Sequence, residues 1–326
     1  MSEIFNRKAS SLTPRQAYIQ REFWRRNVFV IMDTETNGLD PEMYEPCEVA
    51  MLKIVEGVVQ EPFSWYVKPK LPIPPHVQAV HHISNSDVAD AKSMAELAPT
   101  FQEFCVGTVV VAHNAPFDYG MMPCLQDEKF LWVDNLSLAR HQWPLGTTGP
   151  TGHPLTAHKN KILQHWLDIR VDTRGQAAHR AQADILVTAE IFKEAVNQYL
   201  LTLDTTPTAK QFAEYLDTPC KVDVMNFGPY KDLPIEELPT SHIRSILSQH
   251  KNNRMTLGND LLWTLSEAYK ERTQNTHLAA ARQLGLADAT QVSSAQQERL
   301  ALQAKFIAKQ ANNPQTFNTA PTTATK

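Results

Sequence analysis

The chain has 326 residues, of which 42% are hydrophobic and 20% are charged, a balance typical of a soluble globular protein with one large or two smaller domains. No apolar run is long enough to span a membrane, and the N-terminus lacks the apolar centre of a signal peptide. We therefore expect a cytoplasmic protein with no membrane partner. Its four cysteines are far apart and form no CxxC pair, which argues against a zinc cluster or a disulfide framework.

The net charge of −4 is unevenly distributed along the chain. Residues 1–27 carry a net charge of +4, residues 28–205 a net charge of −10, and residues 206–326 a net charge of +2. An acidic central segment repels a polyanion such as DNA unless bound cations or the basic flanks compensate. Taken alone, the charge argues weakly against a nucleic-acid partner.

The N-terminal third of the chain predicts one helix followed by strands. Residues 10–26 have the pattern of a basic amphipathic helix, in which Thr13 suits the N-cap and Pro14 the first helical position. The continuous apolar run after it predicts a strand buried on both faces. The predicted strands lie at residues 28–32, 48–55 and 63–69, and residues 71–77 predict a proline-stiffened loop.

Helices and strands alternate in the rest of the acidic segment. Helices are predicted at residues 93–105, 116–125, 135–142, 156–167 and 180–200, and strands at residues 108–114 and 131–133. A strand cluster followed by this alternation predicts an α/β fold with a mixed sheet flanked by helices. Residues 203–208 resemble a linker. The last helix is predicted at residues 291–311, before a polar tail that we expect to be disordered.

Two carboxylates lie at the end of the first predicted strand. Asp33 and Glu35 are two positions apart, so both side chains should project from the same face, at the strand end where α/β sheets bind ligands. Two negative charges this close are unfavourable unless a cation neutralises them. Oxygen ligands favour Mg²⁺ or Mn²⁺ over zinc. The pair alone is a weak signal, and a helix or turn cap stays open as the alternative.

A second polar group follows the apolar strand predicted at residues 108–114. Asp118 falls in the first turn of the next predicted helix, where a carboxylate can simply stabilise the helix N-terminus. Asn114 suits the N-cap of that helix. A structural role is the stronger alternative for Asn114, whereas a functional role is favoured for Asp118.

A third group contains His179 and Asp184. Asp184 lies within a strongly predicted helix and shares a face with apolar residues such as Ile191. An aspartate facing the core is unfavourable unless it is paired or bound to a metal. His179 precedes this helix and can reach a site near Asp184. On its own, a histidine at a helix start more often has a structural role.

These three groups resemble a known set of motifs. The segments DTETNGLD (33–40), HNAPFD (113–118) and HRAQAD (179–184) are similar, in order and spacing, to the exonuclease motifs of the DEDDh group of DnaQ-like 3′→5′ exonucleases. Further along, the segment FGPYKD (227–232) resembles the FGKYKG-type pattern that opens the module following the nuclease in the bacterial exonuclease X family. The resemblance covers roughly residues 28–250.

The resemblance implies both a fold and a site. The fold is an RNase H-like mixed sheet flanked by helices, with a small C-terminal α+β module and a flexible tail. Asp33, Glu35, Asp118 and Asp184 match the acids that hold two divalent cations, Mg²⁺ or Mn²⁺, and His179 matches the general base. Four further motif positions are candidate substrate contacts: Thr34, His113, Asn114 and Phe117. Candidates to stack on nucleic-acid bases are Phe117, Tyr119, His81 and His82.

The predicted domain boundaries follow from these matches. They are a basic N-terminal helix (1–26), a DEDDh exonuclease domain (27–202), a small C-terminal module (209–272) and a helical, then disordered tail (273–326). The basic helix and the module can supply positive charge toward DNA. The residues we would test in the module are Lys231, Arg244, Lys251 and Arg254.

The sequence therefore predicts a metal-dependent 3′→5′ exonuclease that releases nucleoside 5′-monophosphates from DNA, at single strands or 3′ ends. Three alternatives stay open: an exonuclease that trims RNA or oligonucleotides with the same site, a proofreading subunit associated with a polymerase, and a catalytically inactive binding module. The presence of all four acids and the histidine argues against the last. The C-terminal module can also be a protein-interaction module that recruits the nuclease.

Overall fold

The computed structural model describes residues 12–172, 180–225 and 227–283, with side chains described as far as residue 274. The chain divides into two compact units, Met1–Cys220 (unit 1) and Lys221–Lys326 (unit 2).

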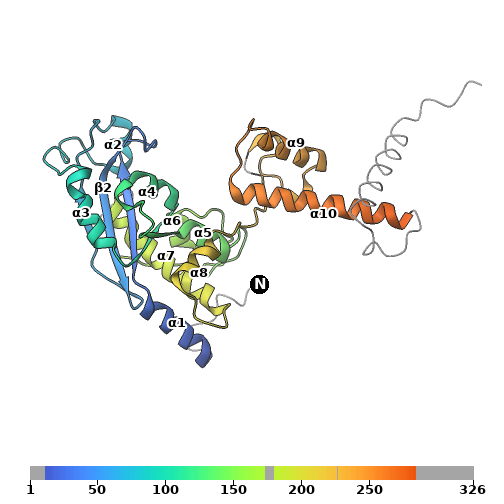
Figure 1. Cartoon of the computed structure of the whole chain (residues 1–326), viewed down its shortest axis with the longest axis horizontal. Coiled ribbons are helices and arrows are strands. Elements are labelled where there is room, and N and C mark those ends of the chain that lie inside the picture. The colour runs from blue at the N-terminus through green and yellow to red at the C-terminus, as the bar shows by residue number, and fades with distance from the viewer. Residues whose placement is uncertain (1–11, 173–179, 226, 284–326) are drawn as a thin grey trace, which may run out of the picture. The chain divides into compact units, whose positions relative to one another are not determined.

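A six-stranded mixed sheet forms the centre of unit 1 (Figure 1). Its order is β3-β2-β1-β5-β6, and β4 also pairs with β2. β1 runs antiparallel to β2 and parallel to β5, which in turn runs parallel to β6. The strands are β1 (Phe29–Thr36), β2 (Pro46–Val55), β3 (Val58–Val59), β4 (Phe63–Tyr66), β5 (Val109–Ala112) and β6 (Leu131–Asp134). The predicted α/β class, with a mixed sheet flanked by helices, is confirmed.

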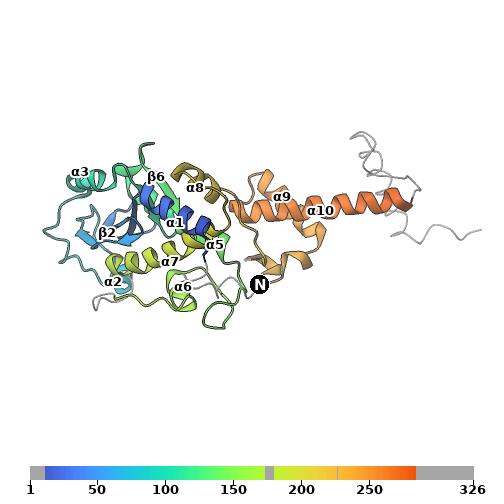
Figure 2. The same cartoon turned by 90° about the horizontal axis from the view of Figure 1, so that it is seen from below.

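Helices cover both faces of this sheet, with α3 on one side of β2 and α7 on the other (Figure 2). The helices of unit 1 are α1 (Pro14–Arg26), α2 (Pro75–His81), α3 (Met94–Cys105), α4 (Ala115–Met121), α5 (Asn135–Gln142), α6 (Asn160–Trp166), α7 (Ala181–Leu201) and α8 (Ala209–Leu216). All four cysteines are free thiols, as the sequence predicts.

Alternation along β1 decides which side chains face which helices. Phe29 and Ile31 belong to the core that contains α1, α7 and α8, whereas Val30 and Met32 belong to the core under α3. Because successive residues of a strand point to opposite faces, Asp33 and Glu35 continue the face covered by α7. The apolar half of β1 thus sets the direction of the acids at its end.

Helix α1 forms as predicted, and a capping box holds its start. The Thr13 hydroxyl accepts the backbone N–H of Gln16, and the Gln16 side chain accepts the backbone N–H of Thr13. The apolar face of the helix, including Phe23 and Trp24, is buried in unit 1. Three of its cations are paired with acids of the same unit: Arg15 with Asp204, and Arg25 and Arg26 with Glu22.

Two of the boundaries that differ from the sequence-based expectation involve prolines. The short helix α2 begins at Pro75, within residues 71–77 where we expected a loop, because Pro75 in the first turn fixes the backbone angle that a helix needs. The helix predicted at residues 116–125 ends at Met121, and a 3₁₀ turn over Pro123–Leu125 follows it. Pro123 lacks the N–H that would continue the helical hydrogen bonds.

Unit 2 is built mainly from helices α9 (Thr240–Lys251) and α10 (Asn259–Gln283). Extended pairing in its described part is limited to an isolated antiparallel bridge between Val224 and Pro234. The Arg272 guanidinium donates to three backbone carbonyls around the 3₁₀ turn that precedes α9. An apolar core joins these parts and includes Met225, Ile235, Ile243, Ile246, Leu261 and Leu265.

The domain boundaries that the sequence predicts, 27–202 and 209–272, remain a prediction. In the structure α8, which lies within the second range, packs into unit 1 through Phe212. The predicted final helix and disordered tail lie outside the described residues. Among the helices that the structure describes, none combines the length and the apolar character that a membrane crossing requires.

Candidate active site

Three of the predicted acids come together between β1 and α7. Asp33 and Glu35 extend from the end of β1, and Asp184 lies in the first turn of α7. One carboxylate oxygen from each can be chosen so that all three lie within 4.8 Å of one another. All three residues are partly buried. Segments about 150 positions apart in the sequence therefore supply one acidic cluster, whose oxygens lie close enough together to hold a cation.

Asp118 approaches this cluster from another helix. It lies in the first turn of α4, is buried, and accepts a 2.8 Å hydrogen bond from the Thr34 hydroxyl. Asp33 is close enough for the Asp118 charge to raise its pKa. The structure thus gives Thr34, a predicted substrate contact, a defined role beside the acids, because its hydroxyl orients the Asp118 carboxylate.

Asp134, a residue that we did not predict, holds the start of α4. One oxygen of its carboxylate accepts the backbone N–H groups of Asn114, Ala115 and Leu136, at 2.9, 3.2 and 2.9 Å. Asn114 occupies the N-cap position as expected, but its side chain makes no capping hydrogen bond and its φ of +77° is left-handed. One carboxylate therefore caps both α4 and α5 and fixes the helix that carries Asp118.

The electrostatics show how unfavourable this cluster is without cations. Burial, followed by the charges of Asp118 and Glu35, holds the pKa of Asp33 well above its usual range. Burial and the nearby Asp184 raise the pKa of Glu35 to about 8. Burial raises the pKa of Asp118 to about 7, although its hydrogen bond with Thr34 opposes the shift. Acids that resist ionisation together ionise readily once a cation lies among them.

The remaining predicted contacts have distinct surroundings. His113 has both ring nitrogens engaged: Nε2 lies 2.7 Å from the His158 carbonyl, and Nδ1 lies 3.2 Å from the Asn135 amide. A contact between His113 and substrate would therefore use its carbon edge. Phe117 is partly buried in α4. These substrate contacts stay predictions.

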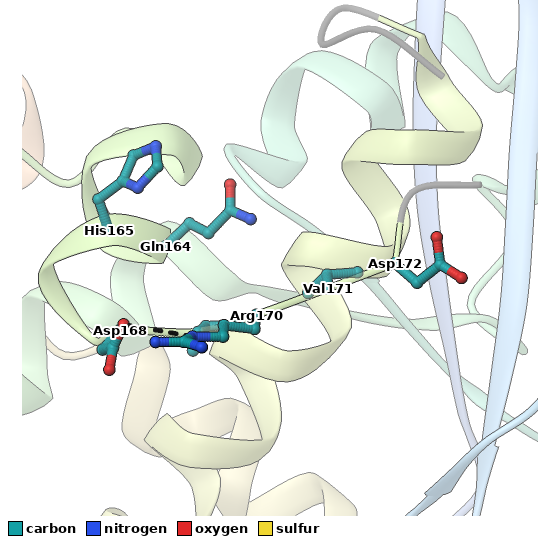
Figure 3. A pocket seen from close by; sticks show the side chains of 7 residues that line it. Gln164, His165, Asp168, Arg170, Val171 and Asp172 are labelled. Carbon is teal, nitrogen blue, oxygen red and sulfur yellow. Dashed lines mark ion pairs between the residues drawn. The ribbon is translucent and has the colours of Figure 1, made fainter. Parts of the chain in front are cut away.

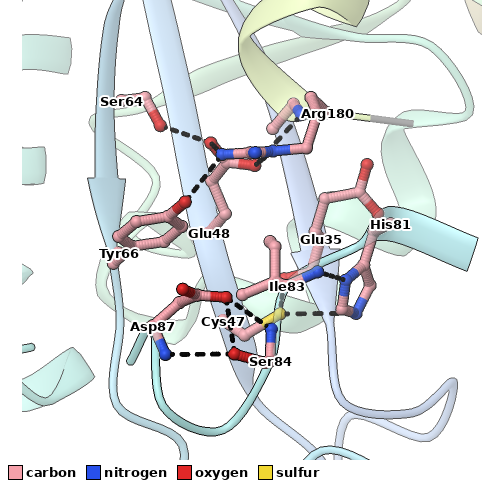
Figure 4. A network of polar contacts seen from close by, with 11 residues as sticks. Glu35, Cys47, Glu48, Ser64, Tyr66, His81, Ile83, Ser84, Asp87 and Arg180 are labelled. Carbon is pink, nitrogen blue, oxygen red and sulfur yellow. Dashed lines mark hydrogen bonds and ion pairs between the residues drawn. The ribbon is translucent and has the colours of Figure 1, made fainter. Parts of the chain in front are cut away.

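His179, the predicted general base, lies outside the described residues, but Arg180 directly after it is described. The Arg180 guanidinium pairs with Glu48, a buried residue of β2 that we did not predict (Figure 4). A signal for Glu48 was present, since it is the one acid in the largely apolar segment PCEVAMLKIV. Its proximity to the acids depends on the pairing of β1 with β2, which the sequence does not reveal.

Among the proposed stacking residues, the prediction for His81 is wrong. Its side chain is 2% exposed, and its ring contacts the backbone N–H of Ile83 and the Cys47 thiol instead (Figure 4). His82 and Tyr119 are exposed. The His81 ring thus connects the end of α2 to β2 and has no surface for a base.

A pocket of about 500 Å³ lies at the end of α6 and along the segment that follows it (Figure 3). Asp168 and Arg170 form a 3.9 Å ion pair at its wall. Its lining consists of Gln164, His165, Asp168, Ile169, Arg170, Val171 and Asp172. None of the clustered acids lies in its wall, so this pocket is separate from the candidate metal site.

Comparison with known proteins relates the chain to exonucleases. A family model described as Exonuclease (RNase T) matches residues 30–192. Exodeoxyribonuclease 10 of Escherichia coli is 28% identical over 209 residues, which cover 64% of this chain and 84% of that protein. A DNA polymerase III subunit epsilon-like protein of Rhodobacter capsulatus is 38% identical over 167 residues, 50% of this chain and 23% of that protein.

Among solved structures, exonuclease X in complex with 5′ overhanging duplex DNA covers 58% of this chain and 99% of that chain, with 29% identity and a TM-score of 0.47. The family match spans the strand that carries Asp33, the helix that carries Asp118 and the first half of α7. The chain therefore belongs to the exonuclease family, within the DnaQ-like superfamily of 3′→5′ exonucleases, and is a hydrolase of phosphodiester bonds.

Proposed function

We propose that this enzyme is a metal-dependent 3′→5′ exodeoxyribonuclease that removes nucleoside 5′-monophosphates from DNA ends with the help of two divalent cations. The observation that carries the proposal is the convergence of Asp33, Glu35 and Asp184, whose oxygens lie within 4.8 Å of one another. Asp118, whose charge raises the pKa of Asp33, completes the set.

The residues present fit hard divalent cations. Each of the four side chains offers carboxylate oxygens, and the set contains no thiolate or imidazole, which is the ligand chemistry of Mg²⁺ and Mn²⁺. In this proposal Asp33, Glu35 and Asp184 would hold the cation on the side of the attacking water, and Asp33 and Asp118 would hold the other. When bound, the two cations would clamp the scissile phosphate and acidify the attacking water.

The protein residues have separate tasks in the reaction. His179 takes the proton from the attacking water, whose oxygen bonds to phosphorus while the 3′-oxygen leaves. A histidine with an unperturbed pKa of about 6.5 suits this task near neutral pH. Thr34 holds the Asp118 carboxylate through its 2.8 Å hydrogen bond, and Asp134 holds the helix on which Asp118 lies.

DNA is the proposed substrate because the relative named exodeoxyribonuclease 10 aligns over 84% of its own length. Unit 2 is proposed to contribute positive charge to DNA binding, since Lys231, Arg244, Lys251 and Arg254 are all exposed. Such contacts act on the phosphate backbone and carry no sequence preference.

The test is a time course with a 5′-labelled DNA oligonucleotide in the presence of Mg²⁺, Mn²⁺ or EDTA. The expected result is a ladder that shortens from the 3′ end only with metal, together with release of nucleoside 5′-monophosphates. Equal products in EDTA, or nucleoside 3′-monophosphates, would overturn the proposal. A matched RNA oligonucleotide decides the substrate, because faster degradation of RNA would replace DNA with RNA as the preferred polymer.

A further inference from the structure

A fifth carboxylate lies next to the four proposed metal ligands. Glu48 stands directly opposite Glu35 in the register of β1 and β2. Residues that face each other across antiparallel strands lie on the same face of the sheet, so Glu48 shares the α7 side with Glu35. Its charge acts on both Asp33 and Glu35. Glu48 is 1% exposed, and a carboxylate so close to cations would be drawn toward them unless something else held it.

Arg180 holds Glu48 in a fixed orientation (Figure 4). Its Nε lies 3.2 Å from one Glu48 oxygen and its Nη2 lies 3.3 Å from the other, so the contact is two-pointed. The same Nη2 donates to the Tyr66 hydroxyl at 2.8 Å, and the Ser64 hydroxyl donates to Glu48 at 2.7 Å. Two-point contacts with a planar guanidinium fix direction as well as distance.

The same carboxylate caps the helix that carries Asp184. The backbone N–H of Ala181, the first residue of α7, donates to Glu48 at 3.3 Å. Arg180 occupies the N-cap position and offers no side-chain cap of its own. A negative charge at this end is favourable for a helix of 21 residues. Asp184 lies three residues further on, in the same turn, so the position of this turn decides where its carboxylate lies.

We propose that the Glu48–Arg180 pair is a positioning device for the metal ligands. Arg180 withholds Glu48 from the cations, and Glu48 fixes the first turn of α7 so that Asp184 meets Asp33 and Glu35. The proposal rests on the metal-dependent function proposed above. It assigns no catalytic role to either member, because both act through the position of other residues.

The test compares four full-length proteins: the parental enzyme, Arg180→Met, the double variant Glu48→Gln/Arg180→Met, and Lys193→Met. Lys193 is a matched control, since its side chain is 26% exposed, as is that of Arg180, and it pairs with Glu190 on the same helix. Mn²⁺ binding is measured by calorimetry without DNA, and melting temperature is measured in EDTA and in Mn²⁺. Steady-state kcat and KM are measured on a DNA oligonucleotide.

We expect Arg180→Met to weaken Mn²⁺ binding about 10–100-fold and to lower kcat by a similar factor, as is usual for residues that orient metal ligands. KM for DNA should change by no more than about twofold, because the pair acts through the cations. The double variant should bind Mn²⁺ about tenfold more tightly than Arg180→Met. It removes the uncompensated charge, and the introduced glutamine still accepts a hydrogen bond from the Ala181 N–H. Lys193→Met should bind Mn²⁺ like the parental enzyme.

Several results would overturn the proposal. One is an Arg180→Met variant that binds Mn²⁺ as tightly as the parental enzyme. If the melting temperature of that variant also falls equally in EDTA and in Mn²⁺, the pair supports only the fold. Another is a double variant that binds no better than Arg180→Met.

If Arg180→Met does not fold, Arg180→Lys replaces it. A lysine keeps the charge but cannot make the two-point hydrogen bonds, so Mn²⁺ affinity should fall below the parental value, and parental affinity would refute positioning. A parental enzyme without metal-dependent activity would instead refute the proposed function.

Discussion

The two units of this protein differ in what they bury. Unit 1 contains a group of carboxylates between a strand and two helices, and two of them, Asp118 and Glu48, are almost wholly inaccessible to solvent. Unit 2 has an apolar core, and Thr264 is the buried polar side chain in its described part. Buried like charges oppose folding, whereas an apolar core favours it. The difference supports the proposal that the chemistry takes place in unit 1, because a bound cation would offset the repulsion within such a group.

The largest effect is expected for Asp184→Asn, which removes a charge from the acidic cluster of unit 1. We expect activity on a DNA oligonucleotide to fall at least about 10²–10³-fold, because the site then has one ligand charge fewer. The melting temperature in EDTA should rise, because one repelling charge is gone. Asp223→Asn in unit 2 is the control and should change neither quantity. An active Asp184→Asn enzyme would show that the acidic cluster is not the reaction centre.

The next largest effect is expected for His179→Ala. Loss of a general base should lower kcat about 10²–10⁴-fold, while calorimetric Mn²⁺ binding stays at the parental value because the carboxylates are intact. The pH–rate profile should also lose its acidic limb. Parental kcat in this variant would remove the proton-transfer role from His179.

A smaller effect, on DNA affinity, is expected from removal of unit 2. The cut belongs after Cys220, since a cut before α8 would remove Phe212 from the core of unit 1. The shortened enzyme should keep its kcat at saturating DNA but bind DNA more weakly. The slope of log affinity against log salt concentration should also become shallower. The expected change is about 0.7 for each single-strand phosphate that unit 2 binds in the full-length enzyme. Unchanged affinity and slope would show that unit 2 does not contact DNA.

The smallest effect concerns stability and pH in the metal-free enzyme. The pKa of Glu35 is raised to about 8 and that of Asp118 to about 7, whereas in an unfolded chain both lie near about 4. The native state therefore holds protons that the unfolded state releases, so stability falls as pH rises through this range. We expect the melting temperature in EDTA to fall by several degrees between pH 5 and pH 9, and added Mg²⁺ to remove most of the fall.

A variant separates this effect from general alkaline destabilisation. Glu35→Gln has no charge to develop, so its melting temperature in EDTA should fall less over the same pH range. Equal falls in the parental and Glu35→Gln enzymes would mean that the acidic cluster does not control this pH dependence.

Local sequence patterns predicted the elements that carry the site. The apolar run before Asp33 and the long helix around Asp184 were identifiable because burial on both faces and helical periodicity are visible in one segment. Asp33, Glu35 and Asp184 do meet. Glu48 and Asp134 were missed because their roles depend on which strands and helices become neighbours. Strand register and the partners of capping groups are properties of the folded chain, not of a window of residues.

The aromatic rings around Phe29 have a consequence for how the enzyme can be shortened. Phe23 of α1, Phe29 of β1, Phe192 of α7 and Phe212 of α8 contact one another in pairs, with ring centroids 5.0–6.5 Å apart. The segment that matches the exonuclease family, residues 30–192, contains one of these four rings. A protein trimmed to the recognised family segment would lose the aromatic closure that joins the two ends of unit 1, leaving an apolar face open to aggregation. We therefore expect a stable nuclease fragment to include both α1 and α8.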